Sequence, residues 1–518
     1  MTDKSINQLW GIICDNAFKH PNQIIVKDAD QEWSWKKLLS TGLKYANTID
    51  DSMLELPREA IIPVFVDRTG YSIAAIIGII LSGRAYAPLS IDQPQKRIEE
   101  CFKLLEAKVF VETSRDTVNT FAGLKRIPRP ECHELNEMPD YLNSSKIGKM
   151  LYVLFTSGST GEPKGVLASR SNILNTMIWG QEILDWQADD VIGCATNFFF
   201  DISQFDLLTS LYLNIPLAIY SNPENVNKVI EETERFKITS IFSVPVFFSQ
   251  LLRYGGLRDR RTSSLRRIIS GGDFFPPSHV LGWMDNRPNI EIYNAWGPTE
   301  TSIVNTMHRI IEADRDLLEE GKFAPVGKAH PRMPFVLLDE NEREVTEPEV
   351  RGEICMLGDC VTQGYIHNPD ETKQVYFSWN GQPSFRTKDI GWLDKEKNLY
   401  ILGRKGSVVK ISGYRVDFGE VEKASTAEQG VHLARAFVVE RQEGIKELWI
   451  AVEPFNKESG FDIYKFKKGL RQRLPWYMVP KRVIVYNIIP KNANGKIDRR
   501  LLAETAQKEL WGESAQRV

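Results

Sequence analysis

The sequence predicts an α/β fold, in which a large N-terminal domain of parallel-rich sheets flanked by helices precedes a small, mobile α+β C-terminal domain. Short runs rich in β-branched residues, such as MLYVLFT at 150–156 and IEIYNA at 290–295, alternate with longer amphipathic runs. Strands that alternate with helices are typical of largely parallel sheets. Several of these runs lead directly into Gly-rich or polar turns, and in open α/β sheets that edge is where ligands bind.

The other elements follow in order along a chain of 518 residues, which is longer than one hydrophobic core usually requires. The apolar run IAAIIGIIL at 73–81 is about half as long as a membrane span, so it predicts a buried helix. A second helix is predicted over 169–184. Further strands are predicted in DVIGCAT (190–196), PLAIYS (216–221), ITSIFSV (238–244) and LRRIIS (265–270).

A domain boundary is predicted near residue 404, where the character of the sequence changes. The segment LYILGRKGSVVKISGYRVDFGEVE at 399–422 reads as a β-turn-β unit that runs into a helix, and smaller α+β elements follow it. Gly403 and Gly406 supply the backbone freedom that a linker needs. We therefore predict a large domain over 1–404 and a small domain over 405–518.

Composition and charge exclude several classes of protein. The net charge of −3 and a pI near 6.3 give no general attraction to nucleic acid or to an anionic membrane. The six cysteines include no CxxC pair, and the N-terminus lacks the apolar stretch of a signal peptide, so a cytoplasmic protein is expected. The basic run KFKKGLRQR at 465–473 reads as a solvated helix face, with a docking patch for an acidic partner as the alternative.

The segment TSGSTGEPKG at 156–165 follows a predicted buried strand and combines hydroxyls, glycines and one lysine. Glycines let backbone N–H groups approach phosphate oxygens, and hydroxyls and a lysine complete such a cradle. The segment is not a Walker loop, because its lysine follows a proline and precedes a glycine. A flexible surface turn would need only one or two of these residues, so we expect phosphate binding. The phosphate-binding candidates are Thr156, Ser157, Gly158, Ser159, Thr160, Gly161 and Lys164.

A series of motifs extends over most of the chain in a fixed order. They are WSWKKL (33–38), LSGRAYAPLSIDQP (81–94), the loop at 156–165, FFFDISQFD (198–206), NAWGPTE (294–300), RGEI (351–354), FRTKDIGW (385–392), the segment at 403–422 and NANGKIDR (492–499). This series resembles the adenylate-forming (ANL) superfamily. The resemblance is greatest to the free-standing amino-acid adenylation domains of nonribosomal peptide synthesis, a part of secondary metabolism.

The resemblance implies a ligase that uses ATP and Mg²⁺. A carboxylate attacks the α-phosphate of ATP to give an acyl-adenylate and pyrophosphate, and a thiol then displaces AMP to give a thioester. The loop at 156–165 would hold the departing phosphates. The nearby end of the chain after Lys496 suggests a free-standing enzyme that loads a separate phosphopantetheinylated carrier protein.

Nucleotide contacts are assigned by the same resemblance. NAWGPTE would place Asn294 and Trp296 at the adenine, Thr299 at phosphate and Glu300 at Mg²⁺, with Ala295 and Gly297 also among the nucleotide-binding residues. Taken alone, GPTE is equally well explained as a tight turn that caps a helix. Asp389 matches the aspartate that accepts hydrogen bonds from both ribose hydroxyls, and Arg404 would lie near the nucleotide.

Three residues are expected to act directly in adenylation: Lys496, Lys164 and Glu300. Lys496 matches the lysine that the small domain inserts between the carboxylate and the α-phosphate, where it would stabilise developing charge. Without the resemblance, Lys496 would read as a solvated residue of an Asn-Gly hairpin turn.

Asp201 carries most of the information on substrate. It aligns with the aspartate that pairs with the α-ammonium group of an amino acid, which fatty-acyl and aryl ligases do not need. The structural alternative is a helix N-cap. Positions that match the side-chain pocket are Ile202, Phe205, Ser243, Ile269, Gly271, Ala295, Ile303 and Val304. Because none is charged, an apolar substrate side chain is expected, and space at Gly271 and Ala295 favours a branched aliphatic or aromatic one.

The hinge departs from the family pattern. Gly406, preceded by Lys405, stands where family members usually carry Asp or Lys in the patterns GRxD and GRxK. Glycine permits rotation of the small domain but provides no salt bridge to hold one state. The alternatives to an amino-acid–carrier protein ligase are an acyl- or aryl-CoA ligase, an enzyme for β-amino acids, and a non-catalytic adenylate-binding protein.

Overall fold

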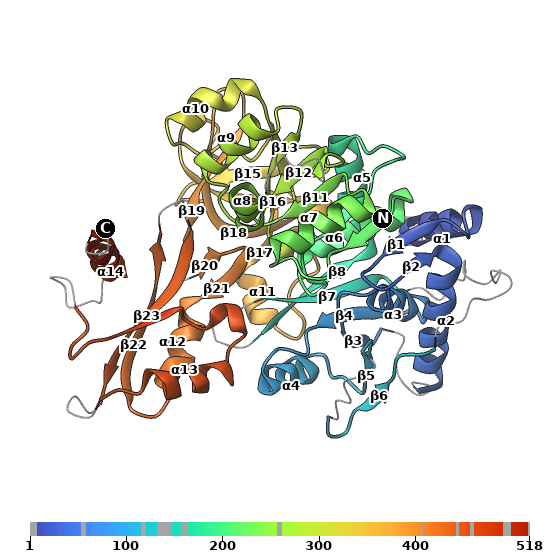
Figure 1. The fold of residues 1–518 in the computed structure, drawn as a ribbon, viewed down its shortest axis with the longest axis horizontal. Coiled ribbons are helices and arrows are strands. Elements are labelled where there is room, and N and C mark those ends of the chain that lie inside the picture. The colour runs from blue at the N-terminus through green and yellow to red at the C-terminus, as the bar shows by residue number, and fades with distance from the viewer. Residues whose placement is uncertain are drawn as a thin grey trace. The chain divides into compact units, whose positions relative to one another are not determined.

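The computed structural model describes residues 8–52, 59–114, 121–131, 148–156, 163–255, 262–405, 408–441, 445–455, 460–490 and 499–515 (Figure 1). Contacts divide the chain into two compact units. The first unit comprises Met1–Ile91, Phe102–Phe155 and Gly165–Gly403, and the second comprises Asp92–Cys101, Thr156–Lys164 and Arg404–Val518. The division into domains 1–404 and 405–518 stays our proposal, because the second unit also includes two earlier segments.

An eight-stranded sheet contains the strands predicted between residues 190 and 295. Its order is β14-β13-β12-β11-β9-β10-β1-β2, and the neighbours from β13 to β1 run parallel, as predicted, while β14 and β2 close the sheet as antiparallel strands. The strands are β1 (Ile24–Lys27), β2 (Glu32–Ser34), β9 (Ile192–Cys194), β10 (Leu217–Ile219), β11 (Ser240–Ser243), β12 (Arg267–Ser270), β13 (Glu291–Trp296) and β14 (Thr306–Ile310).

A six-stranded sheet has the order β6-β5-β3-β4-β7-β8. Its strands are β3 (Ile61–Phe65), β4 (Ala85–Leu89), β5 (Val109–Glu112), β6 (Lys125–Ile127), β7 (Met150–Thr156) and β8 (Lys164–Ser169). The predicted buried helix is α3 (Gly70–Leu81), and every residue from Gly70 to Ile80 is buried. The helix predicted over 169–184 is α5 (Arg170–Leu184), whose first turn is capped by the Ser169 hydroxyl.

Helices pack on the two sheets, because this packing buries the apolar faces of helices and sheets together. One large core joins strands of both sheets with α1 (Gln8–Lys19), α2 (Trp35–Ser52), α3, α5 and α6 (Asp201–Leu213). A second core lies under α7 (Val226–Phe236), α8 (Pro245–Tyr254) and α9 (Pro277–Asn286). The inner strands β9, β10, β11 and β12 are buried along their whole length, which is why they read as continuous apolar runs.

An antiparallel sheet, absent from the sequence prediction, completes the first unit. Its order is β15-β16-β18-β17, and β19 also pairs with β18. The elements of this region are η3 (Thr299–Thr301), η4 (Glu312–Asp314), α10 (Arg315–Glu319), β15 (Phe335–Leu338), β16 (Gly352–Leu357), η5 (Gly358–Cys360), α11 (Pro369–Val375), β17 (Tyr376–Trp379), β18 (Gln382–Leu393) and β19 (Leu399–Arg404).

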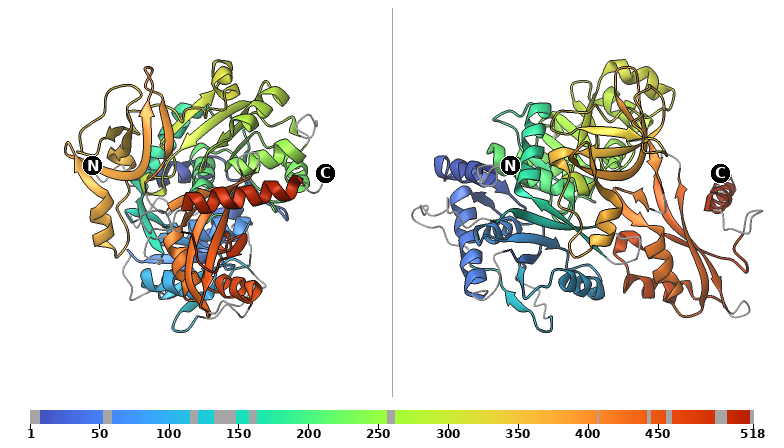
Figure 2. Two further views of the ribbon diagram at one scale, coloured as in Figure 1. Left: turned by 90° about the vertical axis from the view of Figure 1, so that its left-hand side faces the viewer. Right: turned by 180° about the vertical axis from the view of Figure 1, so that it is seen from behind.

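The second unit has the predicted α+β character. A hairpin of β20 (Val408–Ile411) and β21 (Tyr414–Asp417) runs into α12 (Phe418–Thr426), as the segment at 399–422 predicted. A sheet in the order β22-β23-β24 follows, with α12 and α13 packed through one core and α14 through another (Figure 2). The other elements are α4 (Gln95–Leu104), β22 (Val431–Glu440), β23 (Lys446–Pro454), α13 (Ile463–Arg471), η7 (Trp476–Met478), β24 (Arg482–Val485) and α14 (Arg499–Ala515).

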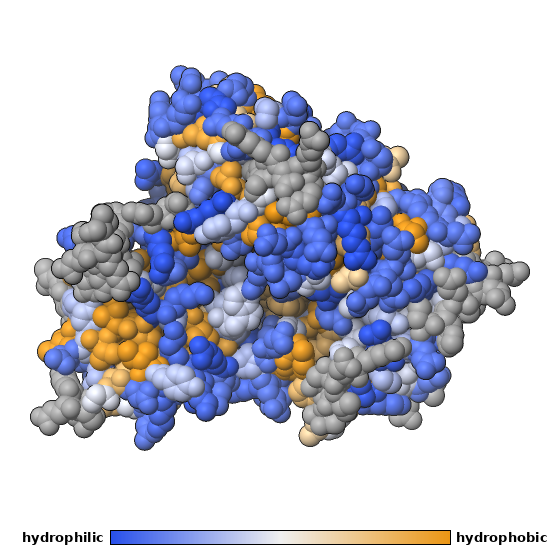
Figure 3. Space-filling model, in the orientation of Figure 1, coloured by the Kyte–Doolittle hydropathy of each residue, from blue (hydrophilic) through white to orange (hydrophobic). Residues whose placement is uncertain are grey.

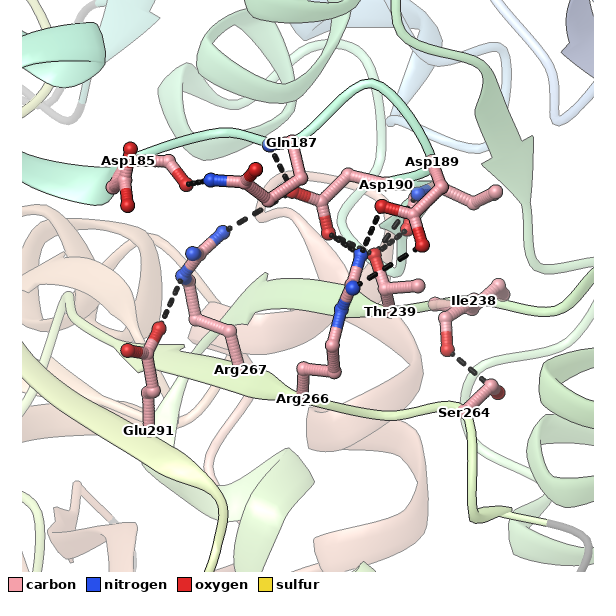
Figure 4. Close-up of polar contacts among 11 residues, drawn as sticks. Asp185, Gln187, Asp189, Asp190, Ile238, Thr239, Ser264, Arg266, Arg267 and Glu291 are labelled. Atoms are coloured by element: carbon pink, nitrogen blue, oxygen red, sulfur yellow. Dashed lines mark hydrogen bonds and ion pairs between the residues drawn. The ribbon is translucent and has the colours of Figure 1, made fainter.

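Charged residues fasten the amino ends of the parallel strands to one another (Figure 4). Arg266 donates to both Asp189 and Asp190, with Nη2–Oδ1 distances of 3.0 and 2.8 Å, and Thr239 Oγ1 donates to Asp190 Oδ1 at 2.6 Å. Arg267 Nε donates to Glu291 Oε2 at 3.1 Å. The ligand-binding candidates lie at the opposite edge of the sheet, at the carboxyl ends of these strands.

No helix among the described residues is both long enough and apolar enough to cross a membrane.

Candidate active site

The candidate residues of the first unit gather at the carboxyl edge of the eight-stranded sheet. Neighbouring parallel strands bring Ser243 beside Ser270, and Ser270 beside Asn294. Gly271 follows β12, and its N–H donates to the Ser243 carbonyl at 3.1 Å. Ala295 and Trp296 end β13. The predicted edge therefore does hold these side chains together.

The loop between β13 and β14, residues 297–305, is fixed by its own hydrogen bonds. Asn305 N donates to the Trp296 carbonyl at 2.9 Å, and the Asn305 side chain forms two bonds with Thr301, of 2.5 and 2.7 Å. Ser302 and Ile303 have φ angles of 67° and 85°, a left-handed conformation that is unusual for a β-branched residue such as Ile303. A loop so constrained holds its side chains in defined positions.

Asp201 and Thr299 are joined directly by a hydrogen bond. Thr299 Oγ1 donates to Asp201 Oδ2 at 2.5 Å, across 98 residues of sequence. The other carboxylate oxygen, Oδ1, accepts from the Ile202 backbone N–H at 2.9 Å. Asp201 is the first residue of α6, whose N-cap is Phe200, so the simple N-cap interpretation of Asp201 is wrong. Both Asp201 and Thr299 are half-buried.

Two residues of α6 shape the segment that leads into Asp201. The Ser203 hydroxyl donates to the carbonyls of Asn197 and Phe200 at 2.9 and 2.7 Å. Gln204 Nε2 donates to the Phe198 carbonyl at 2.5 Å, and Gln204 Oε1 accepts from Tyr86 Oη at 2.6 Å. These buried bonds fix the backbone before the helix and hence the place of Asp201.

Asp389 is positioned by an irregularity in β18. The register of β16 and β18 shifts here, because Glu353 pairs with Ile390 but Cys355 pairs with Arg386. Lys388 has a φ of 63°, and the Asp389 N–H donates to Thr387 Oγ1 at 3.0 Å. A bulge re-aims side chains, and the buried Asp389 carboxylate thereby accepts a 3.1 Å hydrogen bond from Trp296 Nε1.

Glu300 lies in the loop and is fully buried. Its Oε1 accepts a hydrogen bond from Tyr365 Oη at 2.8 Å, and its backbone carbonyl accepts from Thr362 N and Oγ1 at 3.0 and 2.8 Å. A single carboxylate suits Mg²⁺, which takes one or two protein carboxylates and completes its shell with water and substrate phosphates.

Asn294 uses its amide nitrogen to hold the following segment. Nδ2 donates to the carbonyls of Ala324 and Pro325 at 3.1 and 3.0 Å. The orientation of the amide therefore assigns Oδ1 as the side-chain atom that could contact a ligand, and that atom is a hydrogen-bond acceptor.

An aromatic pair includes Phe205, one of the residues predicted to line the side-chain pocket. The rings of Phe205 and Phe242 meet edge to face with centroids 5.6 Å apart, and both residues are buried. A Cβ added to Gly271 would lie 3.0 Å from Phe242 Cε2, so the space in front of this glycine holds the Phe242 ring. A Cβ added to Gly180 would likewise lie 3.0 Å from Phe205 Cζ. The Phe242 ring therefore takes up part of the space that the sequence analysis expected in front of Gly271.

Asp206 lies on the same helix as Asp201 but in a different environment. It is buried, and burial raises its pKa well above the ordinary value of an aspartate, with Cys194 Sγ as a hydrogen-bond donor that offsets part of the rise. The motif FFFDISQFD therefore contains one half-exposed carboxyl group and one buried carboxyl group whose pKa burial raises.

The remaining candidates are not related to this edge by the structure. Lys496, Gly406 and Ser157, Gly158, Ser159, Thr160 and Gly161 lie outside the described residues. Thr156, Lys164, Arg404 and Lys405 belong to the second unit. Among the residues described, the buried Thr156 hydroxyl has no hydrogen-bond partner, as suits a group that receives a ligand.

Sequence reasoning did not identify Phe242, Gln204, Thr362 or Tyr365. Gln204 lies within FFFDISQFD, where a buried amide in a helix was a detectable signal. Phe242 reads as an ordinary apolar strand residue. Tyr365 and Thr362 lie more than 60 residues after Glu300, and no local pattern connects them to it.

Comparison with known proteins identifies the family of this chain. Residues 14–366 match the family described as AMP-binding enzyme. The chain is 28% identical over 511 residues to delta-poly-L-ornithine synthetase of Acinetobacter baumannii, covering 95% of this chain but only 36% of that protein. It is 28% identical over 489 residues to D-alanine–D-alanyl carrier protein ligase of Bacillus velezensis, covering 91% of this chain and 93% of that enzyme.

Solved structures agree with the fold. A nonribosomal peptide synthetase protein with adenylation and carrier (PCP) domains superposes with a TM-score of 0.84 at 23% identity, covering 95% of this chain and 83% of the other. The Vibrio cholerae adenylation domain AlmE, solved with glycyl-adenosine-5'-phosphate, gives a TM-score of 0.81 at 18% identity and covers 98% of both chains. The predicted acyl-adenylate-forming fold and the predicted class, an AMP-forming ligase, are confirmed. The chain belongs to the AMP-binding enzyme family.

Proposed function

We propose that the protein activates an amino acid with ATP as an aminoacyl-adenylate and then transfers it to the phosphopantetheine thiol of a separate carrier protein. One observation carries this proposal. The Thr299–Asp201 hydrogen bond places a half-exposed carboxylate beside the loop that carries the nucleotide candidates. A carboxylate there can neutralise a substrate ammonium group next to the reacting phosphate.

The nucleotide is held by groups at the end of β13. The Asn294 amide presents an acceptor for the amino group of adenine, and Trp296 contributes an aromatic surface. Asp389 accepts hydrogen bonds from the ribose hydroxyls, in an orientation maintained by Trp296 Nε1. Glu300 would hold Mg²⁺, which when bound offsets the charge of the phosphates.

The chemical step joins a carboxylate oxygen to the α-phosphorus and breaks the bond to the β-phosphate, so that pyrophosphate leaves. Thr299 donates to the phosphate, and Lys496 stabilises the charge that accumulates between the carboxylate and the α-phosphate. The loop residues Thr156 to Gly161 and Lys164 receive the pyrophosphate. None of these groups needs to act as a general base, because the attacking carboxylate is already ionised.

The substrate side chain is apolar and small. The pocket residues are uncharged, so a charged side chain would be buried without a partner. The Phe242 ring lies in front of Gly271, and the Phe205 ring packs edge to face against it. This arrangement replaces our preference for a branched aliphatic or aromatic side chain, which rested on space at Gly271.

The second half-reaction requires a carrier protein. D-Alanyl carrier protein ligases are similar over almost their whole length, and we extend that partner class to this chain. The second unit offers a basic helix, α13, and exposed Phe455, Tyr464 and Trp476. Figure 3 shows apolar surface over β22 and β23 as well. An acidic carrier with an apolar centre would complement such a surface.

ATP–pyrophosphate exchange with a panel of L-, D- and β-amino acids, and with fatty and aryl acids, tests the proposal. Asp201→Ala and Lys496→Ala should each abolish exchange driven by an amino acid. Asp316→Ala, at an exposed position, is the control that should change nothing. An acyl- or aryl-CoA ligase would instead be identified if acids without an amine drove exchange and Asp201→Ala did not change its rate.

A further inference from the structure

We infer that Phe323, supported by Phe274, reads the size of the nucleotide base and so selects ATP over a pyrimidine nucleotide. The inference rests on the proposed function, in which Asn294 meets the base. The starting observation is that the two phenyl rings contact each other, with centroids 5.0 Å apart and ring planes inclined by 44°.

Both phenylalanines lie on segments that meet Asn294. Phe323 immediately precedes Ala324 and Pro325, whose carbonyls accept hydrogen bonds from Asn294 Nδ2 at 3.1 and 3.0 Å. Phe274 follows the end of β12, whose last residue pairs with Asn294 on β13. The contact between the two rings therefore lies close to the side chain that we assign to the base.

The two rings remain outside the core of the protein. Gly272 has a φ of 85°, which glycine adopts without strain, and the chain turns there after β12. Phe275 is buried, and its ring packs near that of Phe248 in the core under α8. Phe274 is only partly buried, and Phe323 is 42% exposed. The pair thus presents an aromatic surface that a flat ligand can cover, and covering it would be favourable.

The side chain of Asn294 does not by itself distinguish adenine from cytosine. Its Oδ1 acceptor suits the amino group that both bases carry, and it opposes guanine and uracil, which carry a carbonyl oxygen in that place. Adenine has two fused rings and cytosine has one, so adenine covers more aromatic surface. Trp296 is only 6% exposed and offers a ligand much less surface than Phe323. The acceptor therefore selects the amino group, and the aromatic pair selects the larger base.

The dissociation constants of ATP and CTP, measured by titration calorimetry on the full chain without amino acid, test the inference. The parent protein should bind ATP more tightly than CTP. Phe323→Ala should weaken ATP binding roughly tenfold and CTP binding much less, because it removes a surface on which a base stacks. Phe323→Tyr, which keeps the ring, should keep the preference for ATP. An unchanged melting temperature of Phe323→Ala would establish that the variant is folded.

The first unit offers a matched control. Tyr254 is an exposed aromatic residue at the end of α8, and Tyr254→Ala should change neither dissociation constant. Equal weakening of ATP and CTP in Phe323→Ala, or an unchanged preference for ATP, would overturn the base-reading role alone. Because the titrations contain no amino acid, failure of the proposed activation is seen separately, as absence of exchange with every amino acid. A parent protein without preference for ATP over CTP would also overturn the inference.

Discussion

The indole nitrogen of Trp296 donates a hydrogen bond to the Asp389 carboxylate at 3.1 Å and so ties the end of β13 to the bulge in β18. Two sheets of the first unit thus meet at the residues assigned to adenine and ribose. The bond is buried, and Asp389 has its backbone N–H bound to Thr387 in addition. The carboxylate that we propose as the ribose acceptor is therefore oriented by groups of the protein itself.

Trp296→Phe should raise the KM for ATP roughly tenfold, since it removes a hydrogen bond to a charged group while keeping an aromatic ring. The KM for the amino acid should change little. Pyrophosphate exchange at varied ATP measures both. Trp392→Phe is the control, because Trp392 also lies on β18 but stacks on Tyr400 with centroids 4.3 Å apart. An equal effect of the two substitutions would remove the special role of the Trp296–Asp389 bond.

Glu300→Gln should raise the Mg²⁺ concentration needed for half-maximal exchange, because the amide keeps the size of the side chain but not its charge. Tyr365→Phe should have a smaller effect, since it removes only the neutral donor to Oε1. The measurement is exchange activity against free Mg²⁺. Glu353→Gln on β16 controls for loss of a buried carboxylate elsewhere. If Glu300→Gln lowers the maximal rate but leaves the Mg²⁺ dependence unchanged, Glu300 is not the magnesium residue.

Phe242→Leu should shift selectivity toward larger side chains, because it shortens the ring that lies in front of Gly271. Leucine is chosen as the replacement since truncation of a buried Phe to Ala costs about 3–5 kcal/mol of stability. The ratio of exchange rates with leucine and alanine as probes should rise, within the ~1–3 kcal/mol range of methylene-level discrimination. Phe248→Leu, in the separate core under α8, should lower stability without changing that ratio. A constant ratio in Phe242→Leu would show that Phe242 does not limit the pocket.

Asp206→Asn should become increasingly stabilising, relative to the parent protein, as pH rises. Burial raises the pKa of Asp206 in the folded protein above its ordinary value of 3.8. Above that value the unfolded chain releases the proton while the folded chain retains it, so stability of the parent falls as pH rises toward the folded pKa. Melting temperatures of both proteins between pH 4 and pH 8 measure the difference.

Asp189→Asn is the matched control for that experiment, with the opposite sign. A hydrogen bond and the charge of Arg266 lower the pKa of the exposed Asp189. The ionised Asp189 therefore contributes to stability above its ordinary pKa, and this contribution is lost as pH falls. Because Asp189 is exposed, the effect on stability should be small and sensitive to salt. A pH-independent difference for Asp206→Asn would mean that Asp206 is ionised in the folded protein.

Much of the first unit was predictable because its strands are buried on both faces. MLYVLFT at 150–156 coincides with β7, and the helix over 169–184 coincides with α5 and its Ser169 cap. A continuous apolar run between turn residues is the sequence pattern that such a buried strand produces. The antiparallel sheet was missed because β18 contains a bulge, and its Lys388 and Asp389 read locally as a turn.

The site was predictable in its residues but not in its contacts. Resemblance identified Asp201 and Thr299 separately, yet their hydrogen bond depends on how α6 and the loop after β13 meet in space. The place of the Phe242 ring was missed for the same reason. Nothing near Gly271 in sequence indicates that the Phe242 ring lies against it.

The loop at 297–305 carries residues assigned to both ligands: Thr299 and Glu300 for the nucleotide, Ile303 and Val304 for the side chain. Hydrogen bonds of the Asn305 side chain hold this loop together, and two consecutive residues, Ser302 and Ile303, have left-handed φ angles. Under the proposed assignment, one loop thus serves both selectivity and catalysis. A designer who exchanges the loop to alter which amino acid is accepted will disturb phosphate handling as well. Directed evolution toward new substrates has an independent route through positions 243 and 269, which lie on strands β11 and β12.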